Sequence, residues 1–389
     1  MRQLRCPCCK QADLDAFFKI PNAPIQSVVA IDNYEAAISI PRRDIVLNFC
    51  NCCGFIFNSE FDTEWDYYTK GYEDQQGFSP TFVEFITRKT QRFIDQYNIK
   101  EKLVVEIGCG KGDFIRLMCD LGRNRGVGID PAWVPGRFPE REDVRFIRDF
   151  YSLGHGDLSA DCITCRHTLE HIFEVDEFMQ TIRASCQGRK PTLFFEVPCM
   201  LRILQVQAFW DIFGEHCSYF SPGSLARVFR RNGFEVVDMF IAYKEQYLFI
   251  VARPVEKPST WTHPLEESIE ALRAIIQVFV RQIEAQVDAW RARLLHYKET
   301  GKKVVIYGGG SKSVAFLTQF DAIGLIEHVV DINPHIQGNY IPGIGLQYVG
   351  PDFLKIYQPD VVIMMNSIYT EEIRNSLHVR GLFPELIGL

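Results

Sequence analysis

One segment with an acid and a histidine stands out in a chain that otherwise alternates predicted strands and helices. It is "AFWDIFGEHCSYFSPGSL", residues 208–225, which has neither the two-residue period of a strand nor the 3.6-residue period of a helix. Glu215 and His216 are adjacent in it. Histidine suits proton transfer near neutral pH, because its ordinary pKa is about 6.5. The pair is therefore a candidate for acid–base chemistry, and the surrounding elements must show which reaction it serves.

Four of the thirteen cysteines form two Cys-x-x-Cys pairs near the N-terminus, in "CPCC" and "CNCCGF": Cys6 with Cys9, and Cys50 with Cys53. Two such turns can complete a tetrahedral Zn²⁺ site. Four thiolates leave no open position for a substrate, so we expect a structural zinc, with Cys8 and Cys52 outside the ligand set. The alternative is four ordinary buried thiols. A segment of this length has little core of its own, so metal binding would supply much of its folding energy.

A glycine-rich turn follows a short apolar run in "LVVEIGCGKGDFIRLMCDLG", residues 103–122. The turn is preceded by Glu106 and contains three glycines that let the backbone pass close to a ligand: Gly108, Gly110 and Gly112. Asp130, in "GVGIDP", follows at the distance expected for an acid that accepts hydrogen bonds from ribose hydroxyls. The pattern predicts a strand, a nucleotide-binding turn and a helix.

Three more strands are predicted after Asp130. "RFIRDFY" places Asp149 and Phe150 at the end of a third strand, where an acid and an aromatic ring can bind and stack an adenine. The fourth strand, in "DCITCRHTLEHI", brings Arg166 and His167 to the same expected cofactor site, and "PTLFFEVP" is a fifth strand.

These motifs resemble the class I S-adenosylmethionine-dependent methyltransferases. The E-x-G-x-G-x-G pattern, the acid after the second strand and the "LEHI" helix start all match. A nicotinamide dehydrogenase fits poorly, because its fingerprint is G-x-G-x-x-G. The resemblance implies an α/β fold with a Rossmann-like sheet and S-adenosylmethionine as methyl donor.

The rest of the chain predicts a connector and a second α/β unit. One helical pattern covers residues 264–301, and "KKVVIYGGGSKSVAFLTQF" then gives a strand, a glycine-rich turn and a helix. Gly308–Gly310 could bind a nucleotide or phosphate group, or could only close a tight turn. We expect four parts: a zinc-binding domain (1–64), a methyltransferase domain (65–255), a helical connector (256–300) and a smaller Rossmann-like domain (301–389).

This order of parts resembles the sugar C-methyltransferases that modify nucleotide-linked keto-deoxysugars. The resemblance spans essentially the full chain and rests on the cysteine pairs, "VVEIGCGKGDF", "EHCSYFS", "VVDINPHIQGNYIPG" and "PDVVIMMNS". It implies that the first domain binds zinc and that the last helps to hold the nucleotide-sugar substrate.

The resemblance also implies catalytic roles. His216 would be the base that removes the proton next to the ketone, and Glu215 would orient the imidazole or bind a sugar hydroxyl. His171, in "LEHIF", would hydrogen-bond the developing enolate or be only a helix-start histidine satisfied by backbone. Tyr72 is the expected partner from an aromatic stretch that also contains Tyr67 and Tyr68; packing between domains is the alternative for each of these tyrosines.

The chain departs from the family at one position. Family members have a tyrosine two residues before the glutamate of the Glu–His pair. Phe213 stands there and cannot donate a hydrogen bond, so that role would be lost or moved to Tyr219. The "GGGSKS" loop also differs from the usual alanine- and lysine-containing version. The alternatives are an O- or N-methyltransferase on another small molecule and a non-catalytic binding scaffold.

Composition limits the function classes. The net charge of −7 argues against general nucleic-acid binding, since phosphate neutralisation needs a basic surface. No apolar run is long enough for a membrane span, and "MRQLRCPCCK" lacks the apolar core of a signal peptide. We therefore expect a cytoplasmic enzyme with reduced thiols, a small-molecule substrate, and no nucleic-acid or membrane partner.

Overall fold

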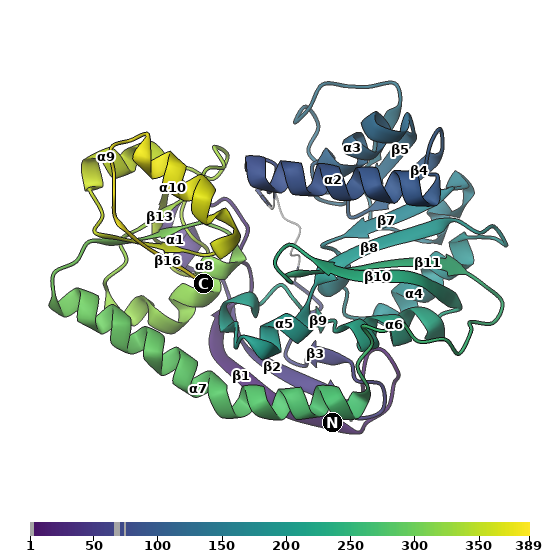
Figure 1. Ribbon diagram of the computed structural model, residues 1–389, viewed down its shortest axis with the longest axis horizontal. Helices are drawn as coiled ribbons and strands as arrows, with labels where there is room; N and C mark the ends of the chain where they lie inside the picture. The colour runs from purple at the N-terminus through teal and green to yellow at the C-terminus, as the bar shows by residue number, and fades with distance from the viewer. Residues whose placement is uncertain (1–3, 66–70, 74) are drawn as a thin grey trace.

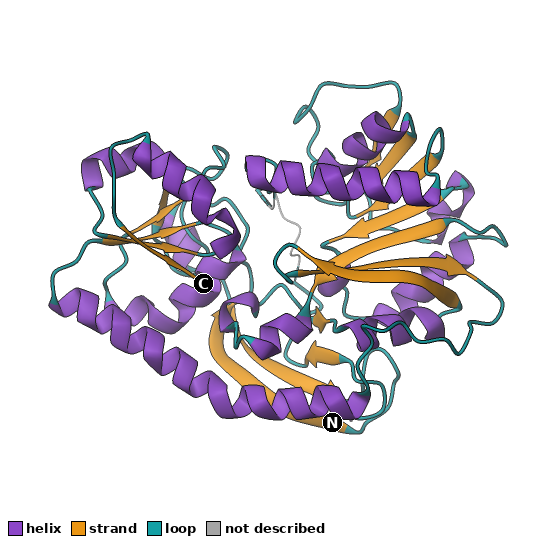
Figure 2. Ribbon diagram, viewed as in Figure 1, coloured by secondary structure: helices purple, strands orange, loops and turns teal. Residues whose placement is uncertain are grey.

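The computed structural model describes residues 4–65, 71–73 and 75–389, and its strands form three sheets (Figures 1 and 2). The first sheet is antiparallel and comes mostly from the N-terminal segment, with the order β1 (Leu14–Pro24), β2 (Arg42–Cys50), β3 (Ile56–Asn58) and β9 (Ser218–Tyr219). The short helix α1 (Tyr34–Ile38) connects β1 to β2. Because β9 begins two residues after His216, pairing of Tyr219 with Ile56 ties the Glu–His segment to the N-terminal sheet.

The second sheet has seven strands in the order β10 (Phe234–Ala242), β11 (Tyr247–Pro254), β8 (Thr192–Pro198), β7 (Cys162–Arg166), β4 (Leu103–Ile107), β5 (Arg125–Ile129) and β6 (Val144–Ile147). β4 to β8 are parallel, and β11 is antiparallel to both of its neighbours. The order reverses at β4, so the crevice at its carboxyl end is the expected ligand site. β6 ends before Asp149, whose N–H bonds back to the carbonyl of Ile147 and turns the chain.

Helices cover both faces of this sheet. α2 (Pro80–Tyr97) and α3 (Asp113–Gly122) pack on one face, where Phe194 of β8 stacks on Phe93 with ring centroids 4.2 Å apart. α4 (Val175–Ser185) and α6 (Pro222–Arg231) cover the other face, where the adjacent Phe195 meets Phe229. Successive side chains of a strand point to opposite faces, so the apolar run "LFF" supplies both cores. α5 (Met200–Gln205) leads into the Glu–His segment.

The long helix α7 (Ile269–Glu299) runs along β1 and β2 and reaches the C-terminal unit (Figure 1). It begins later than residue 264, because the hydroxyl of Ser268 accepts a hydrogen bond from the N–H of Ala271 and caps the first turn. Among the described residues, no helix combines the length and apolarity that crossing a membrane would require.

The third sheet is wholly parallel, in the order β14 (Gln347–Val349), β13 (His328–Val330), β12 (Val304–Tyr307), β15 (Val361–Met364) and β16 (Glu385–Gly388). Its helices are α8 (Ser311–Phe320), α9 (Leu354–Tyr357) and α10 (Thr370–His378). The expected α/β class is confirmed: a mainly parallel seven-stranded sheet follows a small N-terminal sheet and precedes a second Rossmann-like unit.

Candidate active site

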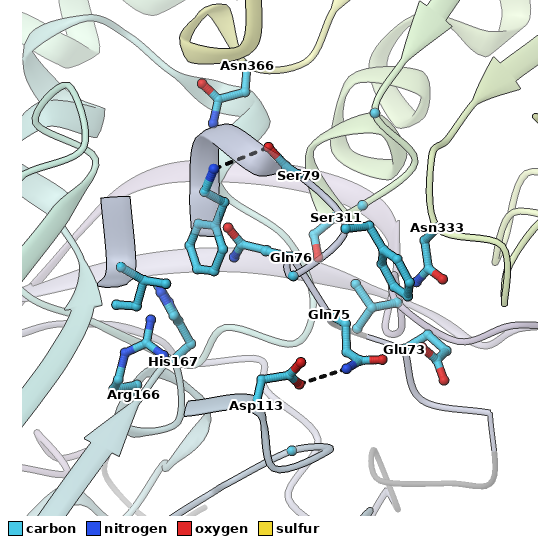
Figure 3. Close-up of a pocket in the computed structure, with 18 of the residues that line it drawn as sticks. Glu73, Gln75, Gln76, Ser79, Asp113, Arg166, His167, Ser311, Asn333 and Asn366 are labelled. Carbon is cyan, nitrogen blue, oxygen red and sulfur yellow. Dashed lines mark hydrogen bonds between the residues drawn. The ribbon is translucent and has the colours of Figure 1, made fainter. Parts of the chain in front are cut away.

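A cavity of about 670 Å³ is lined by residues of the second and third sheets and their loops, and by Val28 and Val29 of the loop that follows β1. This volume suits a small-molecule site. Figure 3 shows Arg166 and His167 on one side of the cavity and Ser311 and Asn333 on another. Both glycine-rich loops and the predicted catalytic histidines also line it: Gly108 and Gly110, Gly308–Gly310, His171 and His216. Side chains more than a hundred residues apart in sequence therefore meet at one site.

The first glycine loop lies at the carboxyl end of β4 and is fixed by an acid. Gly108 has φ +68°, and a Cβ there would lie 2.0 Å from Oγ1 of Thr168. The carboxylate of Asp130 accepts hydrogen bonds from the N–H groups of Gly110 (2.8 Å) and Ala132 (2.7 Å). Asp130 is buried behind the loop, so the structure gives it a role in shaping this loop. Its predicted contact with ribose stays a prediction.

Three other predicted cofactor residues lie outside the cavity lining. Gly112, with φ +97°, begins α3 and packs where a Cβ would meet the ring of Phe146 at 2.5 Å. Asp149 and Phe150 lie on the loop after β6, and the Phe150 side chain is 60% exposed. The structure does not bring these two to the cavity, so their contact with adenine stays a prediction.

Glu106 and Arg166 line the cavity, and each has a buried polar atom that makes no hydrogen bond to the described residues. Within the described residues, neither Oε2 of Glu106 nor Nη2 of Arg166 has a hydrogen-bond partner. Burial raises the pKa of Glu106 to about 8, although the nearby Arg166 acts in the opposite direction. Arg166 is held by a hydrogen bond from Nε to Glu196 and lies 4.3 Å over the ring of Phe114. An acid and a guanidinium, each with an unused polar atom, suit a ligand with both an amino and a carboxylate group.

His167 lies between two buried carboxylates. Its Nδ1 is 3.4 Å from Glu170, and its Nε2 is 3.4 Å from Glu196. Burial lowers the pKa of His167, but the charges of Glu196 and Glu170 outweigh this and raise it to about 9. Burial raises the pKa of Glu196. The positive charges of Arg166 and His167 lower it by more, so the pKa of Glu196 lies below its ordinary value. His167 is therefore a cation at neutral pH.

The two predicted catalytic histidines face one another. Their ring centroids lie 4.9 Å apart with the rings nearly perpendicular, and Nδ1 of His171 is 3.0 Å from the carbonyl oxygen of Glu215. A backbone hydrogen bond from Cys217 to the carbonyl of Glu170 fixes the two segments against each other. Burial lowers the pKa of His216 well below 6.5, and His171 and His167 lower it further. His216 is therefore neutral and able to accept a proton.

Glu215 points to the N-terminal part of the chain. The N–H of Ser27 (3.0 Å) and its hydroxyl both donate to the carboxylate, and that hydroxyl also lies 2.8 Å from the hydroxyl of Ser311. Among the described residues, the His216 imidazole makes no hydrogen bond to this carboxylate, so the first of the two predicted roles of Glu215, orienting the imidazole, has no direct contact behind it; the second, binding a sugar hydroxyl, stays a prediction. Burial raises the pKa of Glu215, whereas the bonds from Ser27 lower it. Glu215 thus joins all three parts of the chain beside the histidines.

The predicted tyrosines occupy different surroundings. Tyr72 lines the cavity and is 8% exposed. Tyr219 lies outside the lining, with its ring 6.1 Å from that of His216. The substituted Phe213 lines the cavity and packs on His216 at 4.1 Å. Tyr67 and Tyr68 lie outside the described residues.

The second glycine loop repeats the geometry of the first. The carboxylate of Asp331, at the end of β13, accepts hydrogen bonds from the N–H groups of Gly309 (2.5 Å) and Asn333 (2.7 Å). Asp130 and Asp331 thus hold their loops in the same way. Each accepts one hydrogen bond from a glycine N–H of the loop and one from the N–H two residues after the acid. Unlike Asp130, Asp331 lines the cavity.

A charged cluster lies beside this second loop. Lys312, in the first turn of α8, is 2.9 Å from Asp211, which also binds Arg202 at 2.9 Å. All three line the cavity. Two cations against one acid leave a net positive charge next to the N-terminus of α8, which favours an anionic ligand.

The four predicted zinc ligands gather at one point. Their Sγ atoms lie within 4.8 Å of one another, with 3.7 Å between Cys6 and Cys53 and 3.5 Å between Cys9 and Cys50. A tetrahedral zinc with Zn–S bonds of about 2.3 Å would separate its sulfurs by about 3.8 Å. The donor set and the spacing therefore fit zinc.

Several residues of this site were not predicted from the sequence. Glu196 had a signal, because it is a single carboxylate at the carboxyl end of the apolar strand β8. Glu170 had a weaker one as the neighbour of His171. Ser27 and Lys312 had none, since their roles arise from contacts between distant parts of the chain.

Comparison with known proteins defines the class. Residues 79–239 match the family model described as methyltransferase domain, and residues 265–381 match the one described as C-methyltransferase C-terminal domain. Together with the sheet order and the glycine loop, these matches make the chain an S-adenosylmethionine-dependent methyltransferase.

Among curated proteins, the chain is similar to the C-methyltransferase NovU of Streptomyces niveus, with 26% identity over 292 residues, 70% of this chain and 68% of that protein. Among solved structures it is similar to 1,6-didemethyltoxoflavin-N1-methyltransferase of Burkholderia thailandensis (18% identity, 46% of this chain, 83% of that chain, TM-score 0.34). It is also similar to magnesium protoporphyrin IX methyltransferase of Synechocystis PCC 6803 (13% identity, 45% and 84%, TM-score 0.34).

Proposed function

We propose that this enzyme transfers a methyl group from S-adenosylmethionine to the carbon next to the ketone of a nucleotide-linked keto-deoxysugar. The carrying observation is that two glycine loops from two Rossmann-like units open on the same cavity as His171 and His216. One loop suits the methyl donor. The other suits a second substrate that has a nucleotide part of its own. The match to the model of C-methyltransferase C-terminal domains supports carbon as the acceptor.

The amino-acid part of the donor would be held by the two orphaned groups, Glu106 at the amino group and Arg166 at the carboxylate. A positive amino group beside Glu106 would favour the ionised carboxylate. Bound there, S-adenosylmethionine supplies a methyl group from its sulfonium and leaves as S-adenosylhomocysteine.

His216 would act as the general base. A ketone acidifies the neighbouring C–H bond, so a neutral imidazole can remove that proton and leave the electron pair in an enolate. The substrate carbon then forms the new bond to the methyl group, and His216 returns its proton to solvent. His171 lies where a hydrogen bond to the enolate oxygen would stabilise the developing charge.

The nucleotide part would bind at the second loop. The N-terminus of α8 attracts a diphosphate, and the surplus positive charge of Arg202 and Lys312 over Asp211 adds to this. Asp331 would accept a hydrogen bond from a sugar hydroxyl, because it lines the cavity at the equivalent place to the ribose-binding acid of nucleotide folds.

Product analysis tests the proposal. The enzyme is incubated with S-adenosylmethionine labelled in its methyl group and a panel of 4-keto-deoxysugars linked to thymidine, uridine, cytidine or guanosine diphosphate. We expect one product whose label resides on a ring carbon. A label on oxygen or nitrogen would instead support an O- or N-methyltransferase, and absence of transfer to every panel member would refute the sugar substrate.

We also propose a structural zinc, and expect one Zn²⁺ per chain. Cys53→Ser should lose the metal and lower thermal stability, because the site joins two loops of a small sheet. Cys52→Ser is the matched control, since this thiol is exposed and stands next to the site. Elemental analysis of gently purified protein checks the content; no stoichiometric metal in the wild type would exclude the site.

A further inference from the structure

Glu170 is a buried acid without a hydrogen bond to its carboxylate. Its side chain lines the cavity, yet the residue is only 1% exposed, and neither oxygen accepts a hydrogen bond within the described part of the chain. Its nearest cation is His167, whose Nδ1 lies 3.4 Å from Oε1. A buried carboxylate is costly unless it is paired. His167 offsets part of this cost, but it lies close to only one of the two carboxylate oxygens, and the other has no hydrogen-bond partner among the described residues.

The carboxylate lies beside both catalytic histidines. One oxygen of Glu170, one ring nitrogen of His171 and one of His216 all lie within 4.8 Å of one another. The position is rigid, because the carbonyl of Glu170 accepts a hydrogen bond from Cys217 and the carbonyl of Glu215 is bonded to His171. The acid is therefore held next to the base and does not depend on a flexible loop.

When His216 removes a proton, its imidazole becomes positively charged in surroundings that stabilise a cation poorly. The imidazole is buried, and its ring packs against Phe213 and His171. His167, already a cation, is also near. An imidazolium formed there meets like charge and little water, so it needs a nearby anion. Glu215 is engaged by Ser27, which leaves Glu170 as the acid near the ring nitrogens.

We propose that Glu170 is a positioning residue that stabilises His216 as an imidazolium once it has taken the substrate proton. This rests on the proposed role of His216 as base. Glu170 keeps its own charge throughout, so the proton passes from the substrate carbon to His216 and then to solvent. The arrangement does for this histidine what a buried aspartate does for the histidine of a serine hydrolase.

Several other titratable groups surround the cluster and shape its response to pH. They are Glu106, Cys165, Arg166, His167, Glu196, Glu215 and Cys217. Glu170→Gln removes one negative charge at nearly constant volume. It also weakens the electrostatic hold on the His167 cation, so His167→Gln is measured alongside it to separate the two effects.

The test measures proton exchange and turnover in Glu170→Gln, Glu170→Asp and wild-type enzyme. Exchange of the proton next to the ketone is followed in deuterated water with the nucleotide-linked keto-sugar panel. We expect Glu170→Gln to slow both exchange and kcat by about 10- to 100-fold, less than removal of the base itself, which typically costs about 10²–10⁴-fold. KM and S-adenosylmethionine affinity should stay within about twofold.

The pH profile separates charge from structure. Activity needs neutral His216, so kcat rises with pH through the pKa of that histidine. Loss of the neighbouring anion lowers this pKa. The rise of kcat with pH, which is the acid limb of the profile, should therefore occur at lower pH in Glu170→Gln. Glu170→Asp keeps the charge and should keep the limb. Glu284→Gln, at an exposed acid on α7 outside the cavity lining, is the control and should match wild type.

Three results would overturn the inference while the proposed function stands. Wild type exchanges the proton and Glu170→Gln exchanges it equally fast; both Glu170 variants lose activity with unmoved acid limbs; or wild type holds a second stoichiometric metal that Glu170→Gln loses, which would make the three side chains a metal site. If wild type itself exchanges no proton in any panel member, the proposed carbon acidity fails, and this inference with it.

Discussion

We expect His216→Asn to bind S-adenosylmethionine as wild type does and to lose most of its turnover. His216 is the buried neutral imidazole that faces the cavity, and asparagine keeps a polar side chain of smaller size without a basic nitrogen. General-base catalysis typically contributes about 10²–10⁴-fold, so the loss should fall on kcat and not only on KM. Steady-state kinetics and titration calorimetry with the donor measure the two effects separately.

Proton exchange gives an independent check on this base. Deprotonation can precede methyl transfer, so wild type should incorporate deuterium into the keto-sugar without turnover, whereas His216→Asn should not. An O-methyltransferase would show no such exchange in either protein. The control is His378→Asn, at an exposed position on α10. If His216→Asn keeps near-normal kcat while His171→Asn or Glu215→Gln abolishes it, the base has been misassigned.

The first glycine loop and its acid could be predicted from sequence, because a few consecutive residues carry their geometry. Gly108 needs a positive φ and a missing Cβ, and Asp130 follows a strand of fixed length. Such features survive in any chain that folds into this sheet. The same holds within each cysteine pair, whose spacing turns both sulfurs the same way, whereas the meeting of the two pairs depends on the pairing of β1 with β2.

The contacts around Glu215 could not be predicted from sequence. Ser27 lies 188 residues away, and Ser311 is 284 residues from Ser27. Their meeting depends on β9 joining the N-terminal sheet and on α7 bringing the C-terminal unit back to the cavity. Contacts between residues so far apart leave no pattern in the sequence around either residue. For this reason the sequence did not show that Ser27, from another part of the chain, donates two hydrogen bonds to the Glu215 carboxylate in place of the imidazole.

Glu170 shows an intermediate case. Its neighbour His171 was predicted from the "LEHI" motif, but a glutamate next to it would ordinarily be solvent-exposed. The short turn at residues 169–171 directs it inward, where the segment around His216 covers it. Local sequence therefore fixes its place next to His171, and only the packing of a later segment brings its carboxylate into the site.

The second large effect that we expect concerns stability and pH. The pKa of His167 is raised from about 6.5 in the unfolded chain to about 9 in the folded protein, where Glu196 and Glu170 hold its charge. A raised pKa gives stability that is fully present below pH 6.5 and is lost as pH rises through 9. At 1.36 kcal/mol for each pH unit, this group should contribute about 3 kcal/mol at pH 6.5 that is gone well above pH 9.

Urea unfolding of wild type and His167→Gln at a series of pH values between 6 and 10 measures this contribution. The difference in free energy of unfolding between the two proteins should be largest at pH 6.5 and should shrink by about 3 kcal/mol by the alkaline end. His378→Gln should instead run parallel to wild type, since that side chain is exposed. A gap between wild type and His167→Gln that stays constant with pH would show that His167 acts through packing, and that the two buried acids do not hold it as a cation.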